Sequence, residues 1–107
     1  MNRVDQLLIV LAEEAAEVVQ DTTKALRFGH TEIYQLTGQT NVERLVNELN
    51  DLTAIVEMLQ ADGVIPENFI DREKIAKKKA RVEHFLKYSH SLGRLRTETN
   101  TQGVPQC

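Results

Sequence analysis

The sequence predicts an all-α protein. Aromatic residues make up 5% of the 107 residues and tryptophan is absent, so residue types that favour strands are scarce. Only two prolines, Pro66 and Pro105, occur in the chain. Three long segments repeat apolar residues at the i, i+3, i+4, i+7 spacing of amphipathic helices. These observations favour an antiparallel bundle of three long helices with short turns, forming one domain over residues 1–93.

The first helix is predicted over residues 2–26. Asn2 suits an N-cap position, and Gly29 indicates where the helix stops. The apolar or small residues of its buried stripe are Val4, Leu7, Leu8, Leu11, Ala15, Val18, Val19 and Leu26. Residues 29–40 are expected to form a loop with one turn, closed by Gly38.

The second helix is predicted over residues 41–61, with Asn41 as its N-cap and Gly63 just beyond its end. Its stripe comprises Val42, Leu45, Val46, Leu49, Leu52, Val56 and Leu59. Residues 64–68 are expected to form a turn, in which Pro66 is well placed to begin a short helix.

The third helix is predicted over residues 71–89. Its buried stripe comprises Ile75, Val82, Phe85, Leu86 and Ser89. The polar residues 94–107, beyond Gly93, show no apolar stripe and are predicted to be a disordered tail. A core built from about 100 residues is modest, so the wide stripes indicate that a second copy completes the bundle as a dimer.

The charge is unevenly distributed along the chain. The net charge is −3, but residues 1–70 carry −8 and residues 71–96 carry +6. An acidic body with one basic segment argues against a nucleic acid polymer as partner. No apolar run reaches the ~18 residues of a membrane span. The first residues lack a signal-peptide pattern and Cys107 is the single cysteine, so we expect a cytoplasmic protein.

Two acidic pairs occupy equivalent positions on the first two helices. Glu14 and Glu17 lie roughly 80° and 140° from the centre of the first apolar stripe, and Glu48 and Asp51 have the same offsets on the second. Antiparallel neighbours are related by a two-fold axis that preserves the sign of such an offset. All four carboxylates are therefore expected to converge on one side of the helical hairpin.

Four converging carboxylates repel one another unless a cation intervenes. Hard oxygen ligands of this number suit Mg²⁺, or Mn²⁺ as the alternative. The competing interpretation is a solvated acidic face. A di-iron bundle requires Glu-x-x-His, which is absent, and three scattered histidines with one terminal cysteine do not make a structural zinc site.

The third helix carries a row of cations beside its apolar stripe. Lys74, Lys78 and Arg81 follow the i, i+4, i+7 spacing, while Lys77 is expected to face solvent. Such a row can hold a polyphosphate, with Arg binding through its bidentate fork and Lys as a point charge. The alternative is a solvated face paired with neighbouring glutamates. Lys78 and Arg81 are the candidate substrate-binding residues.

Three segments of the chain together resemble a known family. They are Leu-Ala-Glu-Glu-Ala-Ala-Glu-Val-Val, Val-Asn-Glu-Leu-Asn-Asp-Leu and Lys-Lys-Ala-Arg-Val-Glu. In this order they resemble the EExxE motif, the ExxD motif and the basic third helix of the MazG-like all-α nucleoside triphosphate pyrophosphohydrolases, in particular small bacterial and phage members. The resemblance covers roughly residues 4–93. Thirty residues separate Glu17 from Glu48, which is at or slightly beyond the upper end of the spacing usual in this family. This spacing implies a longer loop over the site.

The resemblance implies hydrolysis of a nucleoside triphosphate between its α- and β-phosphates, and assembly as a homodimer or homotetramer. It implies that Glu14, Glu17, Glu48 and Asp51 hold Mg²⁺. Glu14 or Glu17 would orient or deprotonate the attacking water, and Lys78 and Arg81 would hold the β- and γ-phosphates. A role in cleansing the nucleotide pool of normal or damaged nucleotides follows.

Two other functions stay open. One is a regulatory module that binds a nucleotide or alarmone without hydrolysing it. The other is a structural helical adaptor whose charge asymmetry mediates assembly.

Overall fold

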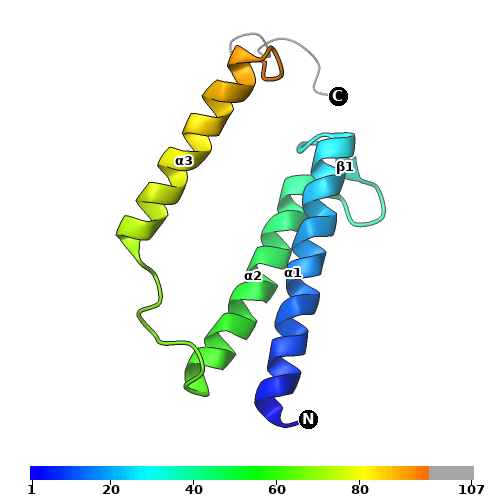
Figure 1. Cartoon of the computed structure of the whole chain (residues 1–107). Helices are drawn as coiled ribbons and strands as arrows, with labels where there is room; N and C mark the ends of the chain where they lie inside the picture. Colours follow the sequence, from blue (N-terminus) through cyan, green and yellow to red (C-terminus); the bar gives the residue numbers. More distant parts are fainter. Residues whose placement is uncertain (97–107) are drawn as a thin grey trace. The chain divides into compact units, whose positions relative to one another are not determined.

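A computed structural model describes residues 1–96 of the chain, and residues 97–107 lie outside it. The structure is predominantly helical, with three helices and one two-stranded sheet in the described residues (Figure 1). It divides into two compact units, Met1–Glu67 and a second unit that begins at Asn68. That boundary falls inside the domain predicted over residues 1–93. Most of the predicted tail, 94–107, lies outside the described residues.

Helix α1 spans Arg3–Phe28 and is capped at both ends as the sequence indicates. The Asn2 side chain accepts a hydrogen bond from the Asp5 backbone N–H at 2.9 Å, and the Asp5 carboxylate accepts one from the Asn2 N–H. This reciprocal capping box satisfies two backbone donors that the first turn leaves unpaired. Gly29 follows the last helical residue with φ of 95°, and its N–H donates to Ala25.

The prediction of an irregular loop over residues 29–40 is wrong in part, because a small β-hairpin forms there. Strand β1 (Ile33–Tyr34) pairs antiparallel with β2 (Gln39–Thr40). The turn closes through the Gly38 N–H, which donates to the Tyr34 carbonyl at 2.8 Å. Gly38 has φ of 71°, a conformation that a side chain disfavours.

Helix α2 spans Asn41–Ala61, within the predicted bounds, but its predicted N-cap is wrong. The cap is Thr40, whose hydroxyl accepts from the Glu43 N–H at 3.0 Å in a second capping box. Asn41 is instead the first helical residue and is 3% exposed. Its side-chain amide donates to the Gly29 carbonyl at 2.8 Å and to the Glu32 carboxylate at 3.2 Å, which fastens the hairpin loop to α2.

Helices α1 and α2 run antiparallel and pack side by side (Figure 1). Within the described residues, Leu7 and Leu59 are the only apolar side chains that become buried. Other members of both predicted stripes stay exposed, among them Leu8, Val19, Leu26, Val42, Val46 and Leu49. The hairpin therefore covers only part of the apolar surface that the sequence assigns to a core.

Helix α3 spans Arg72–Ser91 and belongs to the second unit. Asp71 caps it by accepting from the Lys74 N–H at 3.0 Å. None of its residues, all of which are described, is buried, although the predicted stripe included Val82, Phe85 and Leu86. The short helix expected from Pro66 does not form, and turns occupy that region.

In the part of the chain that the structure describes, no helix combines the length and the apolarity needed to cross a membrane.

Candidate metal centre

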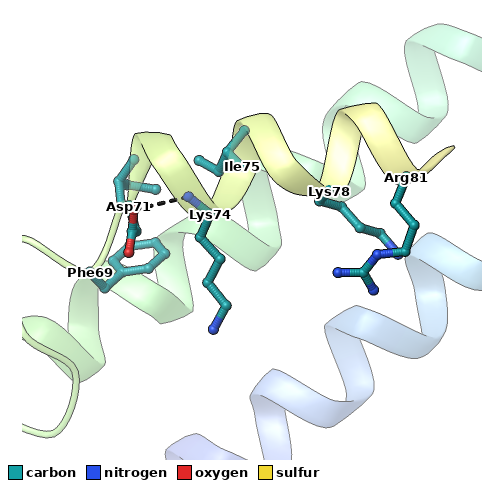
Figure 2. A pocket seen from close by; sticks show the side chains of 7 residues that line it. Phe69, Asp71, Lys74, Ile75, Lys78 and Arg81 are labelled. Atoms are coloured by element: carbon teal, nitrogen blue, oxygen red, sulfur yellow. Dashed lines mark hydrogen bonds between the residues drawn. The ribbon is translucent and has the colours of Figure 1, made fainter. Parts of the chain in front are cut away.

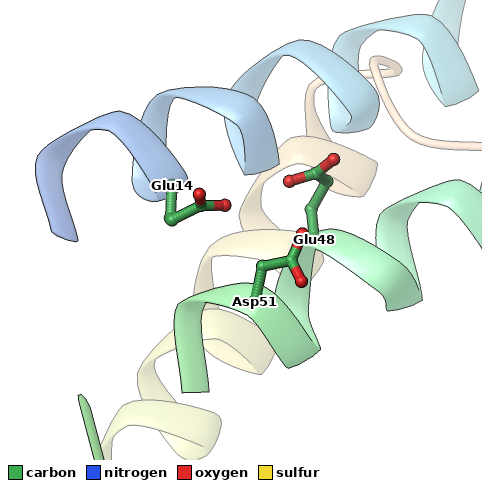
Figure 3. A group of neighbouring side chains, drawn as sticks. All are labelled: Glu14, Glu48 and Asp51. Atoms are coloured by element: carbon green, nitrogen blue, oxygen red, sulfur yellow. The ribbon is translucent and has the colours of Figure 1, made fainter. Parts of the chain in front are cut away.

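Three of the four predicted carboxylates come together between α1 and α2. Glu14 projects from α1, and Glu48 and Asp51 project from α2 toward the same space (Figure 3). Each offers one carboxylate oxygen, and these three oxygens lie within 4.8 Å of one another. Glu14 and Glu48 are half-buried and Asp51 is exposed. We call these three residues the carboxylate triad.

The triad follows from helix geometry. Glu48 and Asp51 are three residues apart, so they share one face of α2. Glu14 has the same offset from its apolar stripe as Glu48, and the antiparallel packing of the two helices brings the equivalent faces together. Glu17 is not part of the group and is exposed. Its offset from the apolar stripe equals that of Asp51, so helix rotation alone does not account for its position outside the triad.

The electrostatics of the triad centre on Glu48. Partial desolvation between the helices raises the pKa of the Glu48 carboxyl above its ordinary value of 4.5, and repulsion from Asp51 and then Asp21 raises it further. Glu14 and Glu17 contribute to the pKa in the same direction. Glu17 therefore influences Glu48 through its charge although it lies outside the triad. A divalent cation at this position would offset the repulsion.

The donor set suits a hard cation. Carboxylate oxygens are the ligands that Mg²⁺ and Mn²⁺ take in proteins, and an octahedral ion retains waters or phosphate oxygens at its remaining positions. Three carboxylates on two packed helices can therefore hold such an ion and leave room for a ligand. A solvated acidic cluster is the alternative for groups this exposed.

An ion pair next to the triad was not predicted from the sequence. Asp21 is 5% exposed, and its carboxylate lies 3.7 Å from the Arg44 guanidinium. The Arg44 guanidinium also lies over the Tyr34 ring, 4.5 Å from its centroid. The signal that could have revealed the pair is spacing, because Asp21 is four residues from Glu17 and Arg44 is four residues from Glu48.

The predicted phosphate-binding residues lie on α3, in the second unit. Lys74, Lys78 and Arg81 extend from the same side of the helix (Figure 2). They line a pocket of about 430 Å³ whose other walls are Phe69, Ile70, Asp71 and Ile75. Lys77 points elsewhere and pairs with Glu73 at 3.4 Å. The cationic row predicted from spacing thus forms one wall of an apolar pocket.

Comparison with known proteins identifies no relative. No family model matches the chain, and neither a curated protein nor a solved structure matches it.

Proposed function

We propose that this protein is a Mg²⁺-dependent nucleotide pyrophosphohydrolase. It would convert a ribo- or deoxyribonucleoside triphosphate and water into the monophosphate and pyrophosphate. The observation that carries the proposal is the carboxylate triad, in which three ligand oxygens from two facing helices lie within 4.8 Å of one another. The resemblance of the acidic motifs and basic helix to MazG-like enzymes supports this reaction over other uses of a divalent cation.

Glu14, Glu48 and Asp51 would hold the ion, with Mg²⁺ as the expected metal and Mn²⁺ as a substitute. When bound, the ion supplies the Lewis acidity that activates water and neutralises charge on the reacting phosphates. The raised pKa of Glu48 supports this assignment, because it reflects desolvation between the helices and then repulsion from neighbouring carboxylates. Metal binding would then release any proton that Glu48 retains.

Glu17 is our candidate for the group that orients the attacking water or accepts its proton, with Glu14 as the other candidate. The support for Glu17 is its place one turn from Glu14 on α1 and outside the triad, which leaves its carboxylate available. A carboxylate that acts as both ligand and base would have to serve two groups at once, which disfavours Glu14.

Lys78 and Arg81 are proposed to bind the β- and γ-phosphates. Their support is the common pocket that they line, in which an ammonium and a guanidinium come from positions less than one helical turn apart. The chemistry of the pair fits the product pyrophosphate as well as the substrate.

We further propose that the protein acts as a homodimer or homotetramer that cleanses the nucleotide pool in the cytoplasm. The small number of buried side chains in the hairpin and the exposed apolar residues of α3 support assembly. The single cysteine supports a reducing compartment.

The test is release of pyrophosphate and orthophosphate from a panel of ribo- and deoxyribonucleoside triphosphates, with Mg²⁺ and with EDTA. Pyrophosphate that requires the metal and disappears in a folded Glu48→Gln variant is the expected result. Glu57→Gln, which changes an exposed glutamate of α2 outside the triad, is the matched control. Orthophosphate alone would overturn the mechanism, and ligand-induced thermal stabilisation without turnover would favour the binding module.

A further inference from the structure

A second pocket of about 300 Å³ lies at the β-hairpin end of the first unit. It is distinct from the pocket on α3 and is formed by α1, α2 and the loop that joins them. Its lining residues are Lys24, Phe28, Glu32, Tyr34, Asn41 and Arg44. We call it the hairpin pocket.

The hairpin pocket contains two aromatic rings, each with an arginine guanidinium over one face. Phe28 and Tyr34 are 48% and 38% exposed, so both rings remain partly open to solvent. The Arg27 guanidinium lies 4.8 Å from the centroid of the Phe28 ring, and the Arg44 guanidinium lies 4.5 Å from that of Tyr34. Aromatic rings and guanidinium planes are the surfaces on which proteins stack nucleobases.

The polar side of the hairpin pocket comprises Lys24, Arg44, Asn41 and the Glu32 carboxylate. The buried Asn41 amide donates to Glu32 Oε1 at 3.2 Å and is itself anchored to the Gly29 carbonyl at 2.8 Å. An ionised carboxylate offers about four lone-pair positions, of which this bond uses one. Glu32 therefore presents further acceptor capacity next to the rings. A flat ligand that donates a hydrogen bond from its edge therefore suits the rings and the Glu32 carboxylate.

The hairpin pocket and the carboxylate triad share one face of the helical hairpin. On α2, Arg44 precedes Glu48 by one turn and Asn41 precedes it by two, which corresponds to about 6 Å and 10 Å along the helix axis. On α1, which runs antiparallel to α2, Lys24 follows Glu17 by seven residues and therefore lies toward the same end of the hairpin as Arg44 and Asn41. A base in the pocket would thus lie about one nucleoside length from an α-phosphate at the triad.

We infer that the hairpin pocket binds the base of the nucleotide substrate and selects bases that carry an exocyclic amino group. This inference rests on the proposed function for the location of the phosphates. Cytosine, adenine and guanine each offer an N–H donor from an amino group to Glu32. Uracil and thymine have a carbonyl oxygen, which a carboxylate repels, in place of the 4-amino group of cytosine, and their ring N3–H is the donor left at that edge. A site built to accept a hydrogen bond rejects an analogue that lacks the donor.

The decisive experiment compares dCMP with dUMP, which differ at the 4-amino group and its carbonyl replacement. Titration calorimetry on the full-length protein with Mg²⁺ is expected to show dCMP binding at least about tenfold more tightly. Glu32→Gln replaces one acceptor oxygen by a donor amide, so the ratio should fall toward one. Glu57→Gln, the same substitution at an exposed site outside the pocket, should leave the ratio unchanged.

A second variant tests the stacking surface. Phe28→Ser should weaken dCMP and dUMP alike, by about tenfold, because a ring stacks on either base. Equal binding of the two nucleotides by the wild type, no binding of either, or an unchanged ratio in a folded Glu32→Gln variant each overturns the inference.

Pyrophosphate release measured on the same protein separates this inference from the proposed function. Release without discrimination between dCTP and dUTP refutes the base pocket and leaves the hydrolase intact. Selective binding of dCMP without any pyrophosphate release refutes the hydrolase and retains the pocket.

Discussion

The two units of this protein use their polar residues in opposite ways. In the α1/α2 hairpin, polar groups are paired within the unit. Two capping boxes close the helix N-termini locally, and the buried Asn41 and the Asp21–Arg44 ion pair join segments distant in sequence. In α3, charge and apolar surface face outward together, and Phe85 is 57% exposed. The comparison teaches that contacts within its own unit stabilise the hairpin, whereas the apolar and charged side chains of α3 stay exposed.

The largest expected effect is loss of metal-dependent activity from substitutions that leave the α1/α2 hairpin folded. Glu48→Gln and Asp51→Asn should each reduce Mg²⁺-dependent pyrophosphate release by about 100-fold or more, because losing a metal ligand costs more than the roughly 10–100-fold effect of losing a residue that only hydrogen-bonds to a ligand. Circular dichroism should show unchanged helicity. Retained turnover in both variants would refute the triad as the metal centre.

Asn41→Ala tests whether the hairpin is specified internally. The substitution removes two hydrogen bonds to Gly29 and Glu32 from a side chain that is 3% exposed, so the free energy of unfolding should fall by about 2 kcal/mol. Urea denaturation measures this loss. Phe85→Ser on α3 provides the contrast: it should leave unfolding of the monomer nearly unchanged and weaken self-association in sedimentation equilibrium.

Lys78→Ala and Arg81→Ala test whether α3 contacts the phosphates. Each should raise KM by about tenfold, which corresponds to the loss of one charge-assisted contact of roughly 1.4 kcal/mol. Lys77→Ala is the matched control, because Lys77 pairs with Glu73 away from the pocket. An equal rise in KM for all three variants would indicate a diffuse charge effect instead of a specific contact.

The smallest expected effect concerns the pH dependence of stability without metal. Since the pKa of Glu48 is raised in the folded state, the folded protein holds this proton more tightly than the unfolded chain. The resulting destabilisation is absent below the ordinary value of 4.5 and develops as the pH rises through the raised pKa. Glu48→Gln should therefore stabilise the metal-free protein at neutral pH, and this gain should shrink as the pH falls toward 4.5. A gain that does not vary with pH would contradict this assignment.

The helices could be predicted from the sequence because their causes are local. Apolar periodicity, Asn2 and Gly29 locate α1 to within two residues, and the same holds for α2 and α3. The cap of α2 could not be chosen by residue type, since Thr40 and Asn41 are both suitable. Tertiary hydrogen bonds determine which residue caps the helix, because the Asn41 side chain bonds to the loop between α1 and α2 and leaves Thr40 as the cap.

The candidate site was predictable to the extent that helix rotation determines it. The matched angular offsets predicted that Glu14, Glu48 and Asp51 lie close together. Helix rotation alone does not determine whether the Glu17 carboxylate joins them. The β-hairpin has strands of only two residues each, which are too short for an alternating pattern to be visible. The contacts of Arg44 with Tyr34 depend on that hairpin and were missed with it.

Arg44 contacts both the hairpin pocket and a residue next to the carboxylate triad. Its guanidinium lies over the Tyr34 ring and against the Asp21 carboxylate, and the Asp21 charge in turn raises the pKa of Glu48. A ligand that displaces the ring from Arg44 also alters how well Asp21 is neutralised, and thereby the charge of Glu48. If a ligand occupies the hairpin pocket and a cation occupies the carboxylate triad, the two binding equilibria are linked, and each changes the affinity for the other by the same factor.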